Sequence, residues 1–92
     1  MDNGMFYVED VINITGRGVA TIGTVLNGSF STGDSVIIRH NNCAVRDSEI
    51  INTGIISSFD ICGFHDRLAL FLTGVAKEDI AVGDIIERMF PE

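Results

Sequence analysis

Residues 8–34 read VEDVINITGRGVATIGTVLNGSFSTGD, and this stretch decides the fold class. Its apolar residues come in short runs rich in β-branched side chains, separated by glycine, asparagine, aspartate and serine, which is typical of short strands joined by tight turns. Gly16 and Gly18 can supply the positive φ that such a turn needs. The stretch therefore predicts strands at residues 6–14 and 19–26 with a turn between them.

The same pattern continues to the end of the chain. Further strands are predicted at residues 35–39, 45–59, 68–73 and 84–88. His40-Asn41-Asn42 suits a hairpin tip, Gly54 predicts a bulge or interruption in the long fourth strand, and residues 76–79 can form one helical turn. Because closure removes the unpaired edges of a sheet, we expect an all-β fold: a small closed six-stranded antiparallel Greek-key barrel.

Length and composition indicate one globular domain over residues 1–92. The chain is 46% hydrophobic and 21% charged, which is enough apolar surface for a folded core. Six basic and 13 acidic side chains give a formal net charge of −7; Lys77 is the only lysine, and the arginines are scattered along the chain. Such a charge repels nucleic acid at long range, so RNA is disfavoured as a direct partner.

The N-terminal sequence MDNGMF contains an aspartate and no long apolar run, which argues against a secretory signal. No apolar segment has the length of a membrane span. We therefore expect a cytoplasmic protein without a membrane partner.

Several motifs resemble the second domain, a β-barrel, of translational GTPases of the elongation factor Tu family. The resemblance begins with residues 8–34 and continues through Gly33-Asp34-Ser35-Val36 and Thr53-Gly54-Ile55. It extends to Leu70-Phe71-Leu72-Thr73-Gly74-Val75, followed by Lys77-Glu78-Asp79-Ile80 and Gly83. The resemblance covers most of the chain and implies a stand-alone copy of this six-stranded barrel.

The activities of that family are not expected here. The chain has no Gly-x-x-x-x-Gly-Lys-Ser/Thr loop, so the backbone cradle and lysine that hold nucleotide phosphates are missing, and neither a nucleotide nor another cofactor is expected. Ile56 stands where the family has a glutamate that helps to hold the aminoacyl end of tRNA. Arg17, in the matching Gly16-Arg17-Gly18 turn, is the one candidate for an RNA contact that the resemblance implies.

Two His/Cys pairs, His40/Cys43 and Cys62/His65, contain the ligand types of a zinc site. The first pair lies before the predicted fourth strand and the second after it. A strand rises about 3.3 Å per residue, so the pairs are expected to lie too far apart to share a metal or form a disulfide. Catalysis by Cys62, His65 and Asp66 is also disfavoured, because neighbours in sequence seldom form a triad. We expect neither a metal site nor an enzyme.

Doubled aliphatic residues suggest how the barrel is used. They occur at Val36-Ile37-Ile38, Ile50-Ile51, Ile55-Ile56 and Ile85-Ile86, and in a barrel one member of each doublet should face outward. Either the rest of the chain covers these residues or a partner does. The candidate interface consists of Ile37, Ile51, Ile56, Phe59, Ile61 and Phe64.

The function expected from these residues is a protein-interaction module that binds another protein or a second copy of itself. The alternative is a ribosome or RNA adaptor that uses the Arg17 turn.

Overall fold

The computed structural model describes residues 4–60 and 63–89, and for residues 58–60 and 63–65 it describes the backbone only. The elements in chain order are β1 (Met5–Ile14), β2 (Gly18–Asn27), β3 (Ser35–His40), β4 (Cys43–Asp60), β5 (Gly63–Leu72), the 3₁₀ turn η1 (Lys77–Asp79) and β6 (Ile85–Arg88). Within these residues no helix has the length and hydrophobicity required to cross a membrane.

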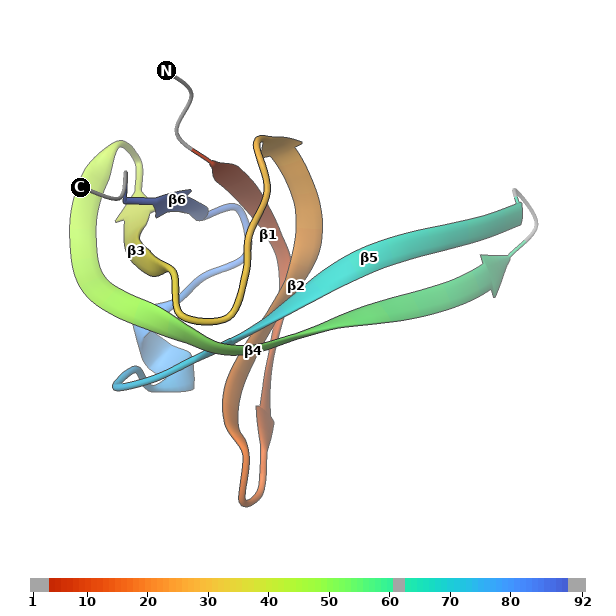
Figure 1. Ribbon diagram of the computed structural model, residues 1–92, viewed down its shortest axis with the longest axis horizontal. Coiled ribbons are helices and arrows are strands. Elements are labelled where there is room, and N and C mark those ends of the chain that lie inside the picture. The colour runs from red at the N-terminus through yellow and green to blue at the C-terminus, as the bar shows by residue number, and fades with distance from the viewer. Residues whose placement is uncertain (1–3, 61–62, 90–92) are drawn as a thin grey trace.

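The six strands pair antiparallel in the closed order β1-β2-β5-β4-β3-β6, so the fold is an all-β barrel as expected (Figure 1). The strands β3, β4 and β5 are consecutive in the chain and each pairs with the next. β2, which precedes β3 in the chain, pairs with β5 on the side away from β4. This arrangement is the Greek key that the sequence predicts.

The barrel interior is filled by aliphatic and aromatic side chains that alternate with outward-facing ones along the strands, except at bulges. Phe6 and Phe30 meet edge to face with ring centroids 5.9 Å apart. The buried cluster comprises Phe6, Val8, Val11, Val19, Phe30, Val36, Ile38, Ile50, Leu70, Leu72, Ile80 and Ile86.

Two local features let β1 and β2 curve into this small barrel. The register of β1 against β2 shifts between Val8 and Asp10, which makes Glu9 the extra residue of a bulge. Opposite Val8 lies Gly23, where an added Cβ atom would be 1.9 Å from the carbonyl oxygen of Tyr7. The two backbones can therefore approach this closely only because residue 23 has no side chain.

The turns agree with the sequence-based expectations. Gly16 and Gly18 have φ of 83° and 94°, and the β3–β4 hairpin turns through Asn41 and Asn42, with φ of 51° and 67°. Positive φ at both central residues is the mark of a type I′ hairpin turn.

Two differences from the predicted strands concern β4 and β5. The bulge in β4 lies at Ile51, between Ile50 and Asn52, and not at Gly54, which pairs normally with Ala69. β5 begins at Gly63 and not at residue 68, because its first half pairs with the second half of β4 instead of forming a loop.

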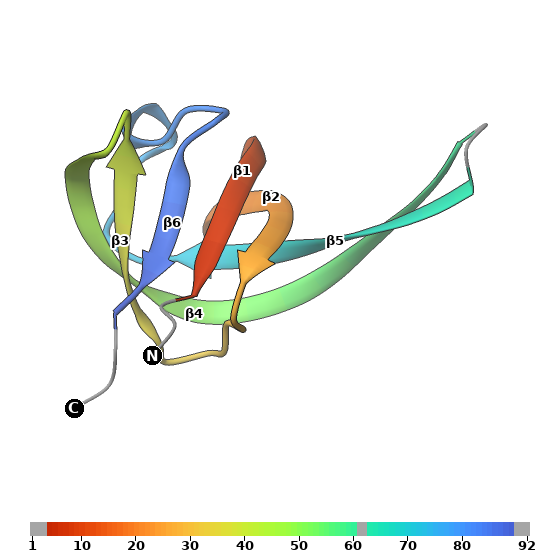
Figure 2. The same ribbon diagram turned by 90° about the horizontal axis from the view of Figure 1, so that it is seen from above.

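This extra pairing creates a projecting two-stranded arm, which we define as residues 56–60 of β4 and 63–67 of β5. β2 pairs with β5 only from Leu68 to Leu72, and β3 pairs with β4 only as far as Glu49. Figures 1 and 2 show the arm extending well away from the barrel.

Candidate functional site

The longest unpaired strand edge among the described residues belongs to β4. β3 begins at Ser35, opposite Glu49, so it does not pair with β4 beyond that residue. The last contacts on this side of β4 are the hydrogen bonds from Gly33 N to Ile50 O at 2.7 Å and from Ile50 N to Asp34 O at 2.9 Å. From residue 51 to residue 60, β4 pairs with β5 alone. We call residues 51–60 the free edge.

Large apolar side chains are exposed along the free edge. Ile51, Ile55 and Ile56 are 47%, 66% and 39% exposed. Ile55 lies opposite Leu68, which packs against the core, whereas Ile56 lies opposite Arg67 on the other face of the arm. Both faces thus carry an exposed isoleucine.

The free edge also differs from the rest of the molecule in charge. Residues 51–59 contain no ionisable side chain, although the chain has a net charge of −7. The opposite edge of the arm, residues 63–67, contains Asp66 and Arg67. Natural proteins usually protect exposed strand edges with charges, proline or bulges, and between the Ile51 bulge and Asp60 this edge has none of them.

The root of the arm is tied to the barrel by polar side chains. Arg67 Nε lies 2.8 Å from Glu9 Oε1, and the Thr24 hydroxyl donates to Glu9 Oε2 at 2.9 Å. Farther out, the Ser57 hydroxyl donates to Asp66 Oδ1 at 2.7 Å across the two strands. These contacts hold the arm where β5 separates from β2.

The predicted interface residues occupy different environments. Ile51 and Ile56 lie on the free edge, whereas Ile37 is half-buried between β4 and β6 in the barrel wall. Phe59 and Phe64 pair through their backbones in the arm, and Ile61 lies outside the described residues.

Ile55 is missing from the predicted set, although it is more exposed than the candidates whose exposure is given above. The Ile55-Ile56 doublet does indicate an exposed aliphatic residue. Because alternation along a barrel strand sends only one member of a doublet outward, Ile56 is the member chosen as exposed and Ile55 is assigned to the core.

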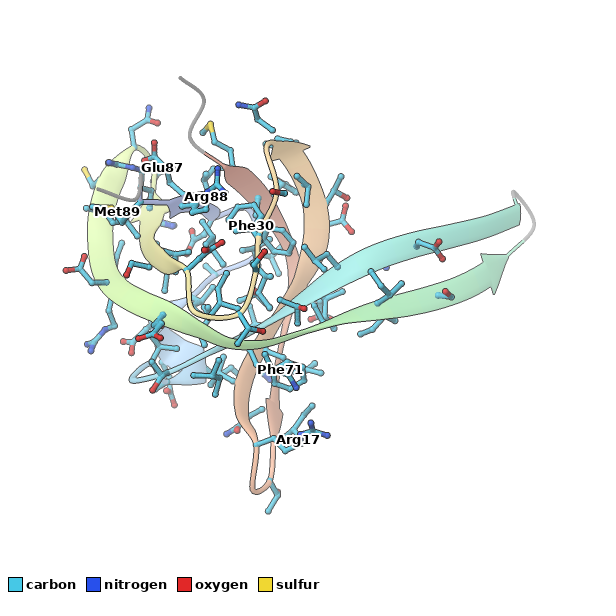
Figure 3. The ribbon with its side chains drawn as sticks, viewed as in Figure 1. Arg17, Phe30, Phe71, Glu87, Arg88 and Met89 are labelled. Atoms are coloured by element: carbon cyan, nitrogen blue, oxygen red, sulfur yellow. The ribbon has the colours of Figure 1, made fainter. Side chains whose placement is uncertain are left out.

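Arg17, the predicted RNA contact, already has a partner in the barrel. Its guanidinium carbon lies 5.4 Å from the centroid of the Phe71 ring, and Figure 3 shows the two side chains on the same side of the molecule. This is the geometry of a cation–π contact. Arg17 therefore helps to cover an outward-facing aromatic ring.

A second feature is a cleft of about 300 Å³ at the end of the barrel. The residues that line it are His40, Val45, Glu78, Asp79, Ala81 and Asp84. His40 Nδ1 and Asp84 Oδ1 are 2.6 Å apart, and Asp84 is only 3% exposed. A carboxylate that holds an imidazole is a component of many hydrolytic sites, but the described lining contains no hydroxyl or thiol to act as nucleophile.

The described members of the two His/Cys pairs lie at opposite ends of β4. His40 is opposite Cys43 across the Asn41-Asn42 turn, and Cys43 is an exposed free thiol. His65 is in the arm, and Cys62 lies outside the described residues. Among the described residues, no group of three or more histidine, cysteine, aspartate or glutamate side chains is arranged to hold a metal ion.

A search with protein-family models finds none that matches this chain. The functional argument therefore depends on the geometry of the free edge.

Proposed function

We propose that this barrel is a protein-binding module and that the free edge of β4 is its binding element. The observation that carries the proposal is the uncharged strand edge at residues 51–59, left open where β4 passes beyond β3. An extended segment of a partner can add to such an edge as a further strand.

The free edge supplies both components of strand addition. Unpaired backbone groups of β4 provide hydrogen bonds, and the exposed isoleucines on its two faces provide apolar contacts. An isolated two-stranded hairpin is marginally stable in water, so an added strand would also stabilise the arm. Binding and ordering of the arm would thus be coupled.

The resemblance to the barrel of translational GTPases forms part of the proposal. In those proteins the barrel lies beside a GTP-binding domain and is not the catalytic part, and we assign a non-catalytic role here as well. A cytoplasmic location belongs to the same proposal, and the exposed free thiol of Cys43 is compatible with a reducing compartment.

Protein binding is favoured over RNA binding by the state of Arg17. Its guanidinium lies over Phe71, and it belongs to a chain with a net charge of −7. One arginine with an internal partner gives little attraction for a phosphate backbone.

Site-specific photo-crosslinking in the native cell tests the proposal. A benzophenone amino acid would replace Ile56 in the arm or, as the control, Val82, which is 64% exposed in the turn before β6. We expect protein adducts from position 56 and far fewer from position 82. Equal yields at the two positions would overturn the proposal, and adducts removed by ribonuclease would favour the RNA adaptor.

A further inference from the structure

We infer that the occupant of the free edge is a second copy of this chain, paired antiparallel about a two-fold axis at Ile55. The inference depends on the proposed function, since it names the partner of the same edge. The two copies would form a four-stranded sheet in the order β5-β4-β4-β5, with the two β4 strands at its centre.

The direction of the backbone groups along β4 supports this pairing. The Thr21 hydroxyl bonds to Leu70 O at 3.4 Å, so the carbonyl of Leu70 faces β2 and not its β4 neighbour Thr53. The N–H of Thr53 is instead bonded to the side chain of Asn52 at 2.9 Å. Because successive residues of an antiparallel strand bond to alternate sides, the N–H and C=O groups of residues 53, 55 and 57 point to the open side.

The position of Ile55 makes this edge self-complementary. Ile55 is the midpoint of the uncharged residues 51–59. In an antiparallel pair, a two-fold axis perpendicular to the sheet at Ile55 places it opposite its own copy and places Thr53 opposite Ser57. All three residues use backbone groups that point to the open side, and Ile55, at 66% exposed, gains the most burial.

Charge explains why two copies would meet at this edge and not at another surface. Two chains that each carry a charge of −7 repel one another over most of their surfaces. Residues 51–59 can approach their own copy without placing like charges together, because they contain no ionisable side chain. Figures 1 and 2 show that the arm, which carries residues 56–59 of this edge, projects from the barrel.

Disulfide trapping tests the register. In a chain with Cys43→Ser and Cys62→Ser, Ile55→Cys places the two new thiols opposite each other, where Cα atoms about 5.5 Å apart permit a disulfide. We expect mild oxidation to give a covalent dimer from this variant and very little from Val82→Cys, which is also at an exposed position. Equal yields from the two variants would overturn the inference.

Light scattering on the unmodified chain tests the assembly. We expect twice the chain mass of 10.0 kDa, and Ile55→Lys should weaken the dimer by about tenfold or more because it places like charges at the axis. Val82→Lys makes the same charge change outside the free edge and should leave the mass unchanged. Circular dichroism verifies that both variants fold.

A monomeric wild-type chain, or a dimer as strong in Ile55→Lys as in Val82→Lys, would overturn the inference. Photo-adducts with other proteins at position 56 would then still support the proposed function. If photo-adducts are absent at position 56 as well, the proposed function also fails, so the two failures are distinguishable.

Discussion

Arg67 at the root of the arm forms an ion pair with Glu9, the bulged residue of β1, with 2.8 Å between Nε and Oε1. The contact reaches across β2, whose Thr24 hydroxyl bonds to the same carboxylate. It therefore links three neighbouring strands at the point where β5 leaves the barrel wall. A bulge that bends β1 thus also positions the side chain that holds the arm.

Replacing Arg67 with glutamine should loosen the arm more than it destabilises the barrel. The two side chains are 47% and 31% exposed, so the free energy of unfolding should fall by about 1 kcal/mol or less. Amide hydrogen exchange in residues 56–60 and 63–67 should become faster, because one contact at the arm's root is lost.

The matched control for this change is Arg46→Gln. Arg46 pairs with Asp79 at 3.3 Å, with exposures of 47% and 28%, and this contact lies outside the arm. Its loss should cost a similar free energy without changing exchange in the arm. Equal exchange rates in the two variants would contradict a holding role for Arg67.

Gly23 and Gly54 should respond in opposite ways to alanine. A Cβ at residue 23 would lie 1.9 Å from Tyr7 O, so Gly23→Ala should lower stability by about 3 kcal/mol. A Cβ at residue 54 meets no atom within 4 Å, and Gly54→Ala should raise stability by about 0.5 kcal/mol by restricting the unfolded chain. Urea denaturation of both variants measures the difference, and similar midpoints would contradict the close approach of β1 and β2.

The second residue of the β3–β4 turn should prefer glycine. Asn42 has φ of 67°. This backbone conformation costs a β-branched residue far more free energy than it costs asparagine, and it costs glycine little. Asn42→Gly should raise the free energy of unfolding by about 0.5 kcal/mol, and Asn42→Val should lower it by about 1 to 2 kcal/mol. Thermal or urea unfolding measures both variants. A shift of stability in the same direction for both would contradict the type I′ assignment.

Asp34 and Asp84 occupy equivalent turns before β3 and β6, but we expect their replacement to lower the free energy of unfolding by different amounts. Asp34 Oδ2 accepts from Ser31 N at 2.8 Å, and Asp84 Oδ2 accepts from Ala81 N at 2.8 Å. Only Asp84 is buried and also bonded to an imidazole, that of His40.

Asp84→Ala should therefore cost about 2 to 3 kcal/mol, because it leaves buried polar groups without partners, whereas Asp34→Ala should cost about 1 kcal/mol. Asp84→Asn should fall between them, since an amide oxygen can still accept one bond. Chemical denaturation of the three variants gives the order, and equal losses for Asp34→Ala and Asp84→Ala would rule out a special role for the His40 contact.

Local chemistry made much of the fold predictable from sequence. The type I′ turn needs residues that tolerate positive φ, and Asn41-Asn42 meets that need wherever the hairpin lies. Asp10 in β1 and Asp79 in η1 bond to nearby backbone N–H groups, as short acidic side chains commonly do. Such features depend only on neighbours in the chain.

The doublets show where prediction from sequence ended. Val36 and Ile38 are buried on either side of a half-buried Ile37, and Ile50 is buried beside an exposed Ile51, as alternation in a barrel wall requires. Ile55 and Ile56 are both exposed, because β4 has left the barrel there and solvent reaches both faces. Alternation identifies two faces of a strand, but it does not say what covers each face.

The sequence by itself determined the six strands, their turns and the acidic character of the chain, because β-propensity, positive φ and charge are properties of residues and their close neighbours. Only the tertiary structure decided that β4 and β5 continue beyond β3 and β2 as an arm. That outcome depends on how far non-adjacent strands run side by side, and the bulge at Ile51 and the Arg67–Glu9 contact mark where they part.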